Sequence, residues 1–198
     1  DLCVAGGQKC LASPPGLAMV SVSDRAWETV SERTSRPYYF DLIRFREFGE
    51  KKQTPFTPAL PLFYALDEAL KMIREEGLEE RFRRHATCAE AFYEAIEVLK
   101  LKPFPERRVR SNTVIAVNVP ADVDSAEVRD VMRERYNVMI GGGMGKLKRS
   151  IFRIGCMGTI SEATTLQTIS ALENALMDVG HKIDLGAGLE ASRKVFHS

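Results

Sequence analysis

The sequence predicts an α/β fold, because segments with the apolar spacing of helices alternate with short segments rich in β-branched residues. Residues 78–99 place apolar side chains three and four positions apart, which is typical of a helix with one buried face. Residues 112–119 are rich in β-branched side chains and end at Pro120, which is typical of a strand. A chain of 198 residues is also long enough to bury a substantial hydrophobic core.

The N-terminal part begins with two short apolar segments, 2–5 and 17–22, which we expect to be buried strands. Two glycines, a lysine and a Pro-Pro-Gly turn lie between them. Residues 24–30 follow as a short helix with Ser23 as its N-cap. Residues 31–58 are polar, contain prolines and aromatic residues, and show no clear periodicity, so we expect a long irregular segment with a functional role.

Helices and strands then alternate to the end of the chain. We expect a helix over 58–76 that stops at Gly77, and a second helix over 78–99. The later elements are a helix capped by Ser125, two short strands and two further helices, over residues 125–135, 137–140, 150–154, 161–179 and 189–196. A second domain begins between Gly77 and Leu99, and we divide the chain into residues 1–85 and 86–198.

Bulk electrostatics do not favour nucleic acid or a membrane surface as a partner, because 28 basic and 27 acidic residues leave a formal net charge of +1. No apolar run is long enough to cross a bilayer, and the N-terminus lacks the pattern of a signal peptide. The four cysteines show no metal-binding spacing, so we expect reduced thiols in a cytoplasmic protein and no metal site.

Lys9 lies between the two apolar segments at the N-terminus, where burial of an ammonium group is costly unless something neutralises or uses it. Burial lowers the pKa of a lysine, and the free amine can then attack a carbonyl and form a Schiff base. The alternative is a surface lysine that begins a loop. The spacing of the residues leaves both interpretations open.

Two further segments contain residue types that bind anions. Thr54 and Thr57 precede a predicted helix, where their hydroxyls can bind an anion, or one of them can serve as a simple N-cap. Arg153 lies in an apolar strand, where it should find a carboxylate. Its planar fork suits bidentate recognition of a ligand, and an ordinary salt bridge on an edge strand is the alternative.

The glycine-rich run 141–146 has some of the character of a phosphate-binding loop, but it lacks the required residues at its two ends. Ile140 stands where that motif needs glycine, and Leu147 stands where it needs serine or threonine. We therefore expect a turn between two strands.

Together these segments resemble the class V aminotransferases, which are pyridoxal-phosphate enzymes of fold type I. The resemblance is to the serine–pyruvate, alanine–glyoxylate and archaeal aspartate aminotransferase type. That family has a small residue, Gly, Ser, Gln and Lys, followed by a tract that ends in Pro-Pro-Gly. This chain matches from Ala5 to Gly16, except that Gly7 replaces the serine. The tracts 53–58 and 152–155 match two further family segments.

The resemblance covers nearly all of the chain as the C-terminal half of the family's fold. It implies that residues 1–85 are the end of the large-domain sheet with a connecting helix, and that 86–198 are a small α/β C-terminal domain. Members of the family are roughly twice this length. We therefore interpret the chain as a fragment whose missing N-terminal half could be present as another chain.

The same resemblance implies the roles of the candidate site residues. Lys9 would bond covalently to pyridoxal 5'-phosphate and act as the catalytic base, and Gln8 would help to hold the cofactor phosphate. Thr54 and Thr57 would contact the phosphate bound to the other subunit of a homodimer, so that the active site is shared. Arg153 would hold the α-carboxylate of the substrate.

The implied reaction moves an amino group from alanine, serine or aspartate to glyoxylate, pyruvate or 2-oxoglutarate. One alternative is another class V enzyme, such as a cysteine desulfurase or a lyase. A second alternative is a non-catalytic fragment that only dimerises. The family's aspartate for the pyridine nitrogen and its stacking ring would lie upstream of Asp1, so we expect no transamination by the isolated chain.

Overall fold

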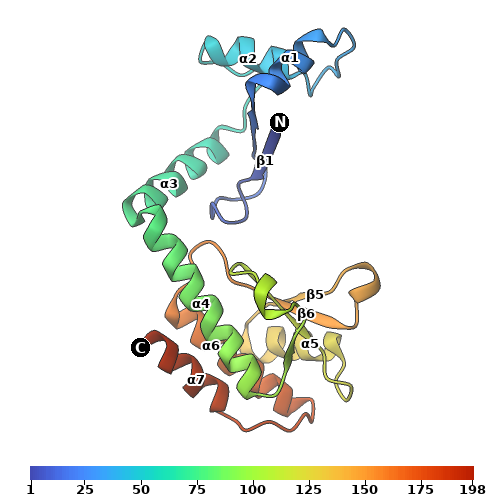
Figure 1. The fold of residues 1–198 in the computed structure, drawn as a ribbon, viewed down its shortest axis with the longest axis vertical. Coiled ribbons are helices and arrows are strands. Elements are labelled where there is room, and N and C mark those ends of the chain that lie inside the picture. The colour runs from blue at the N-terminus through green and yellow to red at the C-terminus, as the bar shows by residue number, and fades with distance from the viewer. The chain divides into compact units, whose positions relative to one another are not determined.

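The computed structural model describes residues 1–198 and divides the chain into two compact units. Unit 1 is Asp1–Glu75 and unit 2 is Glu76–Ser198. The division therefore falls earlier in the chain than the boundary after residue 85 that the sequence suggested. Figure 1 shows the elements of both units along the chain.

Unit 1 is a two-stranded antiparallel ribbon followed by helices. Its register pairs Leu2 with Val22 and Gly6 with Ala18. The elements are β1 (Leu2–Gly6), β2 (Ala18–Val22), α1 (Asp24–Glu32), α2 (Leu42–Glu50) and α3 (Leu60–Glu76), the last of which ends one residue beyond the unit.

Unit 1 has almost no interior, since Gly7, Ser13 and Ala69 are its only buried residues. The side chains of Leu2 and Val4 are 56% and 68% exposed. The prediction of buried strands at the N-terminus is wrong for this chain, because neither face of the ribbon is covered within the unit. So small a buried surface does not stabilise a fold by itself.

The helices of unit 1 confirm two predictions and add one element. The hydroxyl of Ser23 caps α1 by accepting a hydrogen bond of 3.3 Å from the Ala26 N–H, and α3 is followed by Gly77 with a φ of 83°. Helix α2 lies inside the segment expected to be irregular, and the Asp41 carboxylate caps it by accepting from the Ile43 N–H at 3.0 Å. No residue of α2 is buried, and its apolar residues Leu42, Phe45 and Phe48 recur three positions apart over only nine residues.

Unit 2 is a four-stranded antiparallel sheet, in the order β3-β4-β6-β5, packed against helices. Its strands are β3 (Lys102–Pro103), β4 (Val114–Asn118), β5 (Gly141–Gly142) and β6 (Ile151–Gly155). Its helices are α4 (Leu78–Val98), α5 (Ser125–Tyr136), α6 (Glu162–Asp178) and α7 (Ala187–Phe196), with short 3₁₀ turns at Arg107–Val109 and Gly145–Leu147.

One face of this sheet forms the hydrophobic core. Ile115 and Val117 of β4 and Phe152 and Ile154 of β6 are all at most 2% exposed, and they pack with side chains from α4, α5 and α6. Side chains alternate between the two faces of a strand, so Arg153, which lies between Phe152 and Ile154, faces away from that core. Ala116 of β4 and Gly141 of β5, which pair with Arg153, also face away from the core.

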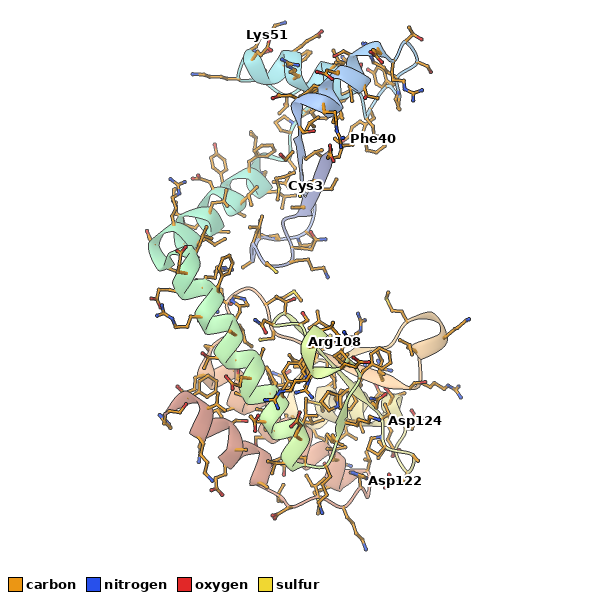
Figure 2. All side chains as sticks on the ribbon, in the orientation of Figure 1. Cys3, Phe40, Lys51, Arg108, Asp122 and Asp124 are labelled. Carbon is orange, nitrogen blue, oxygen red and sulfur yellow. The ribbon has the colours of Figure 1, made fainter.

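Three sequence predictions in unit 2 are wrong in detail. Residues 137–140 are not a strand, and the pairing with β6 is made instead by the two glycines of β5. Asp124 caps α5 by accepting from the Ala126 N–H at 2.6 Å, while Ser125 is buried inside the helix (Figure 2 labels Asp124). Phe82, expected in the buried stripe of α4, is 66% exposed, because the first turns of that helix lie beyond the sheet core.

All four cysteines are free: Cys3, Cys10, Cys88 and Cys156. None of the helices combines the length and the apolar character that crossing a bilayer requires.

A carboxylate clamp fixes the start of α4 to the segment that follows β6. The Glu76 carboxylate accepts hydrogen bonds from Arg84 at 2.5 and 2.9 Å and from Arg81 at 2.9 Å. Arg84 also donates to the carbonyl groups of Gly158 and Ile160. The hydrogen bonds from Arg84 and then from Arg81 lower the pKa of Glu76 from about 4.5 to about 2.

Replacing Glu76→Ala should lower the free energy of unfolding by about 2 kcal/mol at neutral pH, because two partly buried guanidinium groups lose their carboxylate. Since the pKa of Glu76 is lower in the folded state, this stabilisation is fully present above about pH 4.5 and is lost as the pH falls towards 2. Urea unfolding of both proteins at several pH values measures the difference.

Glu80→Ala is the control, because it removes an exposed ion pair with Arg83 on the same helix. An equal loss of stability in the two variants, or a Glu76 effect that does not shrink in acid, would contradict the clamp.

Candidate functional site

Lys9 lies in a tight loop that joins β1 to β2. The Gly7 N–H donates to the Leu17 carbonyl at 3.1 Å, and the Gly7 carbonyl accepts from the Ser13 N–H at 3.0 Å. The Lys9 carbonyl accepts from the Ala12 N–H at 2.9 Å. These bonds across the loop fix the backbone that carries the lysine.

The Lys9 side chain is exposed and makes no hydrogen bond or ion pair with residues 1–198. Of the two interpretations that the spacing left open, the structure agrees with the surface lysine in a loop, because the strands on either side are themselves uncovered. The neighbouring Gln8 side chain folds back over Gly6, where an added Cβ would lie 2.7 Å from Gln8 Oε1. Glycine at position 6 thus makes room for the Gln8 amide beside the lysine.

Thr54 and Thr57 lie in the extended segment that leads into α3. The Thr54 hydroxyl donates to the Phe56 carbonyl at 2.7 Å, and the exposed Thr57 hydroxyl has no partner in the chain. Neither hydroxyl caps α3, which begins at Leu60, so the structure does not support the simple N-cap alternative. The whole segment 52–58, together with Leu60, Phe63 and Tyr64, lines an open depression within unit 1.

Arg153 lies in a row of very small residues across the sheet of unit 2. The register places Ala116 of β4 on one side of it and Gly141 of β5 on the other. Residues directly opposite one another in antiparallel strands share a face, so all three positions lie on the face opposite the core. The methyl group of Ala116 and the single hydrogen of Gly141 are too small to fill the space around the guanidinium.

The Arg153 guanidinium is held in place but not neutralised. Its Nε–H donates to the Gly142 carbonyl at 2.8 Å, which leaves both Nη groups available. No carboxylate of the chain pairs with it, and β6 is an inner strand of the sheet, so the alternative of an ordinary salt bridge on an edge strand is wrong. A partly buried arginine without an acidic partner is suited to bind the carboxylate of a ligand.

The glycine run is a turn between β5 and β6, as the sequence predicted. A Cβ at Gly143 would lie 1.9 Å from the Leu147 carbonyl oxygen, so no other residue fits the turn without moving the backbone. The Gly143 N–H donates to the Ile151 carbonyl at 3.1 Å and closes the turn. This geometry places the Gly142 carbonyl against Arg153.

The five predicted site residues fall into two groups. Gln8, Lys9, Thr54 and Thr57 belong to unit 1 and Arg153 belongs to unit 2. Sequence reasoning missed Ala116 and Gly141 as neighbours of the arginine. Only the strand register identifies them, because alanine and glycine have no functional group in the side chain that would mark them as site residues.

Comparisons with known proteins agree with these features. A profile of the family described as aminotransferase class-V matches residues 1–160. The chain belongs to the class V aminotransferase family.

Two relatives illustrate the similarity in sequence. An uncharacterized aminotransferase of Methanocaldococcus jannaschii is 39% identical over 98% of this chain and 51% of its own length. The serine–glyoxylate aminotransferase of Arabidopsis thaliana is 36% identical over 97% of this chain and 48% of its own length. The chain therefore spans about half the length of the curated relatives that it matches.

Solved structures show the same relation in the fold. The ureidoglycine–glyoxylate aminotransferase of Bacillus subtilis matches 100% of this chain and 52% of its own, with a TM-score of 0.94 at 30% identity. The pyridoxamine–pyruvate aminotransferase of Mesorhizobium loti also gives a TM-score of 0.94, at 32% identity and with the same coverage. The chain has the mixed α/β fold of the C-terminal portion of fold type I aminotransferases.

Replacing Gly143→Ala should lower the free energy of unfolding by about 2 kcal/mol or more, because the new methyl group collides with the backbone at Leu147. Thermal or urea unfolding measures the change. Gly155→Ala is the control, since a Cβ there meets no atom within 4 Å, and it should cost no more than about 0.5 kcal/mol. A Gly143 variant as stable as the Gly155 variant would contradict the described turn.

Proposed function

We propose that the chain is the C-terminal part of a pyridoxal-phosphate-dependent aminotransferase. The observation that carries this proposal is Arg153, a rigidly held guanidinium without an acidic partner between two of the smallest side chains. It offers two parallel N–H donors to a carboxylate, which every amino acid and every 2-oxo acid contains. Membership of the class V aminotransferase family supports the same conclusion.

The donor groups of unit 1 fit the cofactor. Lys9 offers a primary amine that no carboxylate of the chain neutralises, which suits an aldehyde. Gln8 and Thr57 offer an amide and a hydroxyl that make no hydrogen bond within the chain, and Thr54 adds a second hydroxyl, which donates to the Phe56 carbonyl. Amide and hydroxyl donors on a fixed backbone suit a phosphate group.

In this mechanism each residue has a separate task. Gln8, Thr54 and Thr57 would bind the phosphate, and Arg153 would hold the substrate by its α-carboxylate. The bound cofactor would supply a conjugated ring that takes up the electrons of the Cα–H bond. The Lys9 amine would move a proton between Cα of the substrate and a carbon of the cofactor, and in the reverse half of the cycle it would move a proton back to Cα of the product amino acid.

The exposure of Lys9 and of the β1–β2 ribbon indicates that the working site needs further covering. We propose that unit 1 is part of the large domain and is covered by further polypeptide of the kind that relatives of twice this length contain. Unit 2 is then the small C-terminal domain. In a homodimer, Thr54 and Thr57 would serve the cofactor of the second subunit, and we place the enzyme in the cytoplasm.

The names of the relatives suggest small substrates. Their acceptors are glyoxylate and pyruvate, and their donors include serine and aspartate. We propose a donor among alanine, serine and aspartate and a small 2-oxo acid as acceptor. For the alternative of a cysteine desulfurase, Cys88 and Cys156 are unsuitable nucleophiles, because they are at most 1% exposed and burial raises the pKa of both thiols, to about 12 at Cys156. Only the exposed Cys3 and Cys10 are left for that role.

In the protein at its full natural length, Arg153→Gln should raise KM for both the amino acid and the 2-oxo acid about 30- to 100-fold, because a charge-assisted pair worth about 2 to 3 kcal/mol is lost. Ala116→Leu should also raise KM, since its side chain fills the space beside the guanidinium. Steady-state kinetics with both substrates measure these effects.

Arg149→Gln, a change at an exposed arginine in the same turn, is the matched control and should leave KM unchanged. If the Arg153 and Ala116 variants kept the KM values of the control, the proposed carboxylate site would be wrong.

Thr57→Val removes one hydroxyl at nearly constant shape and should weaken the binding of pyridoxal phosphate about 10-fold, because a hydrogen bond to a charged group is lost. The binding of pyridoxal, which has no phosphate, should not change. Thr34→Val at another exposed threonine of unit 1 is the control. Equal weakening of pyridoxal and pyridoxal phosphate would contradict a phosphate contact.

A further inference from the structure

Phe56, in the same segment as the two threonines, belongs to a cluster of five aromatic side chains. Tyr39 stacks on the Phe56 ring with centroids 4.9 Å apart and an angle of 24° between the planes. Tyr38 and Phe45 also lie near Phe56, with ring centroids 5.6 and 6.3 Å away, and Phe48 of α2 joins the cluster through Arg44, which lies over its ring. Figure 2 labels Phe40 and Lys51, which flank that helix.

Arg44 of α2 extends into this aromatic cluster. Its guanidinium carbon lies 5.1 Å from the centroid of the Phe56 ring, 5.2 Å from that of Tyr38 and 5.8 Å from that of Phe48. All three distances are within the range of cation–π attraction. The side chain is only partly exposed, so three rings on one guanidinium restrict its orientation.

The guanidinium of Arg44 has no polar partner in the chain. No carboxylate lies within ion-pair distance of it, and it makes no hydrogen bond with residues 1–198. Arg46, two positions further along the same helix, differs in this respect. It also lies over a ring, that of Trp27 at 4.9 Å, but it pairs with Glu50 at 3.7 Å.

These contacts orient the Arg44 guanidinium and leave its N–H donors available for an anion. A guanidinium stacked on rings is weakly hydrated and already oriented, so binding a ligand costs little desolvation and little side-chain entropy. Its five N–H donors form a fork that matches the oxygens of a phosphate or a carboxylate. Phe56, which packs against Arg44, also lines the depression formed by residues 52–58 with Leu60, Phe63 and Tyr64, so one ring connects the arginine to that depression.

We propose that Arg44 binds an oxyanion group of a small molecule that occupies the depression beside Thr54 and Thr57. The inference rests on the proposed function for the identity of that molecule. Two groups would offer such an oxyanion: the phosphate of the cofactor and the second carboxylate of a dicarboxylic substrate such as aspartate. Arg153 takes the first carboxylate of any substrate, so the two arginines have different tasks.

The test uses the protein at its full natural length and three variants: Arg44→Gln, Arg44→Lys and, as the matched control, Arg46→Gln. Calorimetry measures the binding of inorganic phosphate to protein freed of cofactor. We expect about 10-fold weaker phosphate binding for Arg44→Gln, an intermediate value for Arg44→Lys and no change for Arg46→Gln. Should Arg44→Gln fail to fold, Arg44→Lys provides the comparison.

Two further measurements distinguish the sources. Weaker binding of pyridoxal phosphate with an unchanged KM for aspartate assigns Arg44 to the cofactor phosphate. A raised KM for aspartate with an unchanged KM for alanine assigns it to the second carboxylate. The proposal would be overturned if Arg44→Gln changed none of these affinities, or if Arg46→Gln changed them equally. Wild-type protein that binds phosphate but not pyridoxal phosphate would contradict only the proposed function.

Discussion

The hydrogen bond from Arg153 to the Gly142 carbonyl is the interaction on which the proposed site of unit 2 depends. It uses the inner nitrogen of the guanidinium at 2.8 Å and leaves the outer pair for a ligand. The bond exists because Gly143 allows the chain to turn tightly after β5. Gly141, with Ala116 on the other side, keeps bulky side chains away from the positive charge. A charged group is thus kept oriented and accessible on the back of a well-packed sheet.

The two units are each held together by different interactions. Unit 2 has a core of fully buried side chains and a charged clamp at Glu76, so its strands hold their positions by packing. Unit 1 fixes its backbone by hydrogen bonds across the Lys9 loop but buries only three residues. Its candidate site residues therefore have defined attachment points and uncovered surroundings. Under the proposed function, further polypeptide would pack on this unit, as the greater length of the relatives suggests.

Much of this arrangement could be predicted from the sequence. Apolar periodicity located α3, α4 and α6, and the β-branched run located β4. Helix α2 was not predicted, because its apolar pattern spans only nine residues within a segment that is otherwise polar and contains prolines. The strand expected at 137–140 shifted onto the glycines of β5, since pairing depends on the register with β6, which one strand alone does not encode. For the same reason the neighbours of Arg153 emerged only from the structure, as did the position of Arg44 among three rings.

The central claim is that the Lys9 amine bonds to the aldehyde of pyridoxal phosphate. The most direct measurement is borohydride reduction of the full-length protein after incubation with the cofactor, followed by digestion and mass spectrometry of the peptides. The account predicts one pyridoxyl group, on the peptide that contains Lys9. A pyridoxyl group on a different lysine, or none on any peptide, would contradict it.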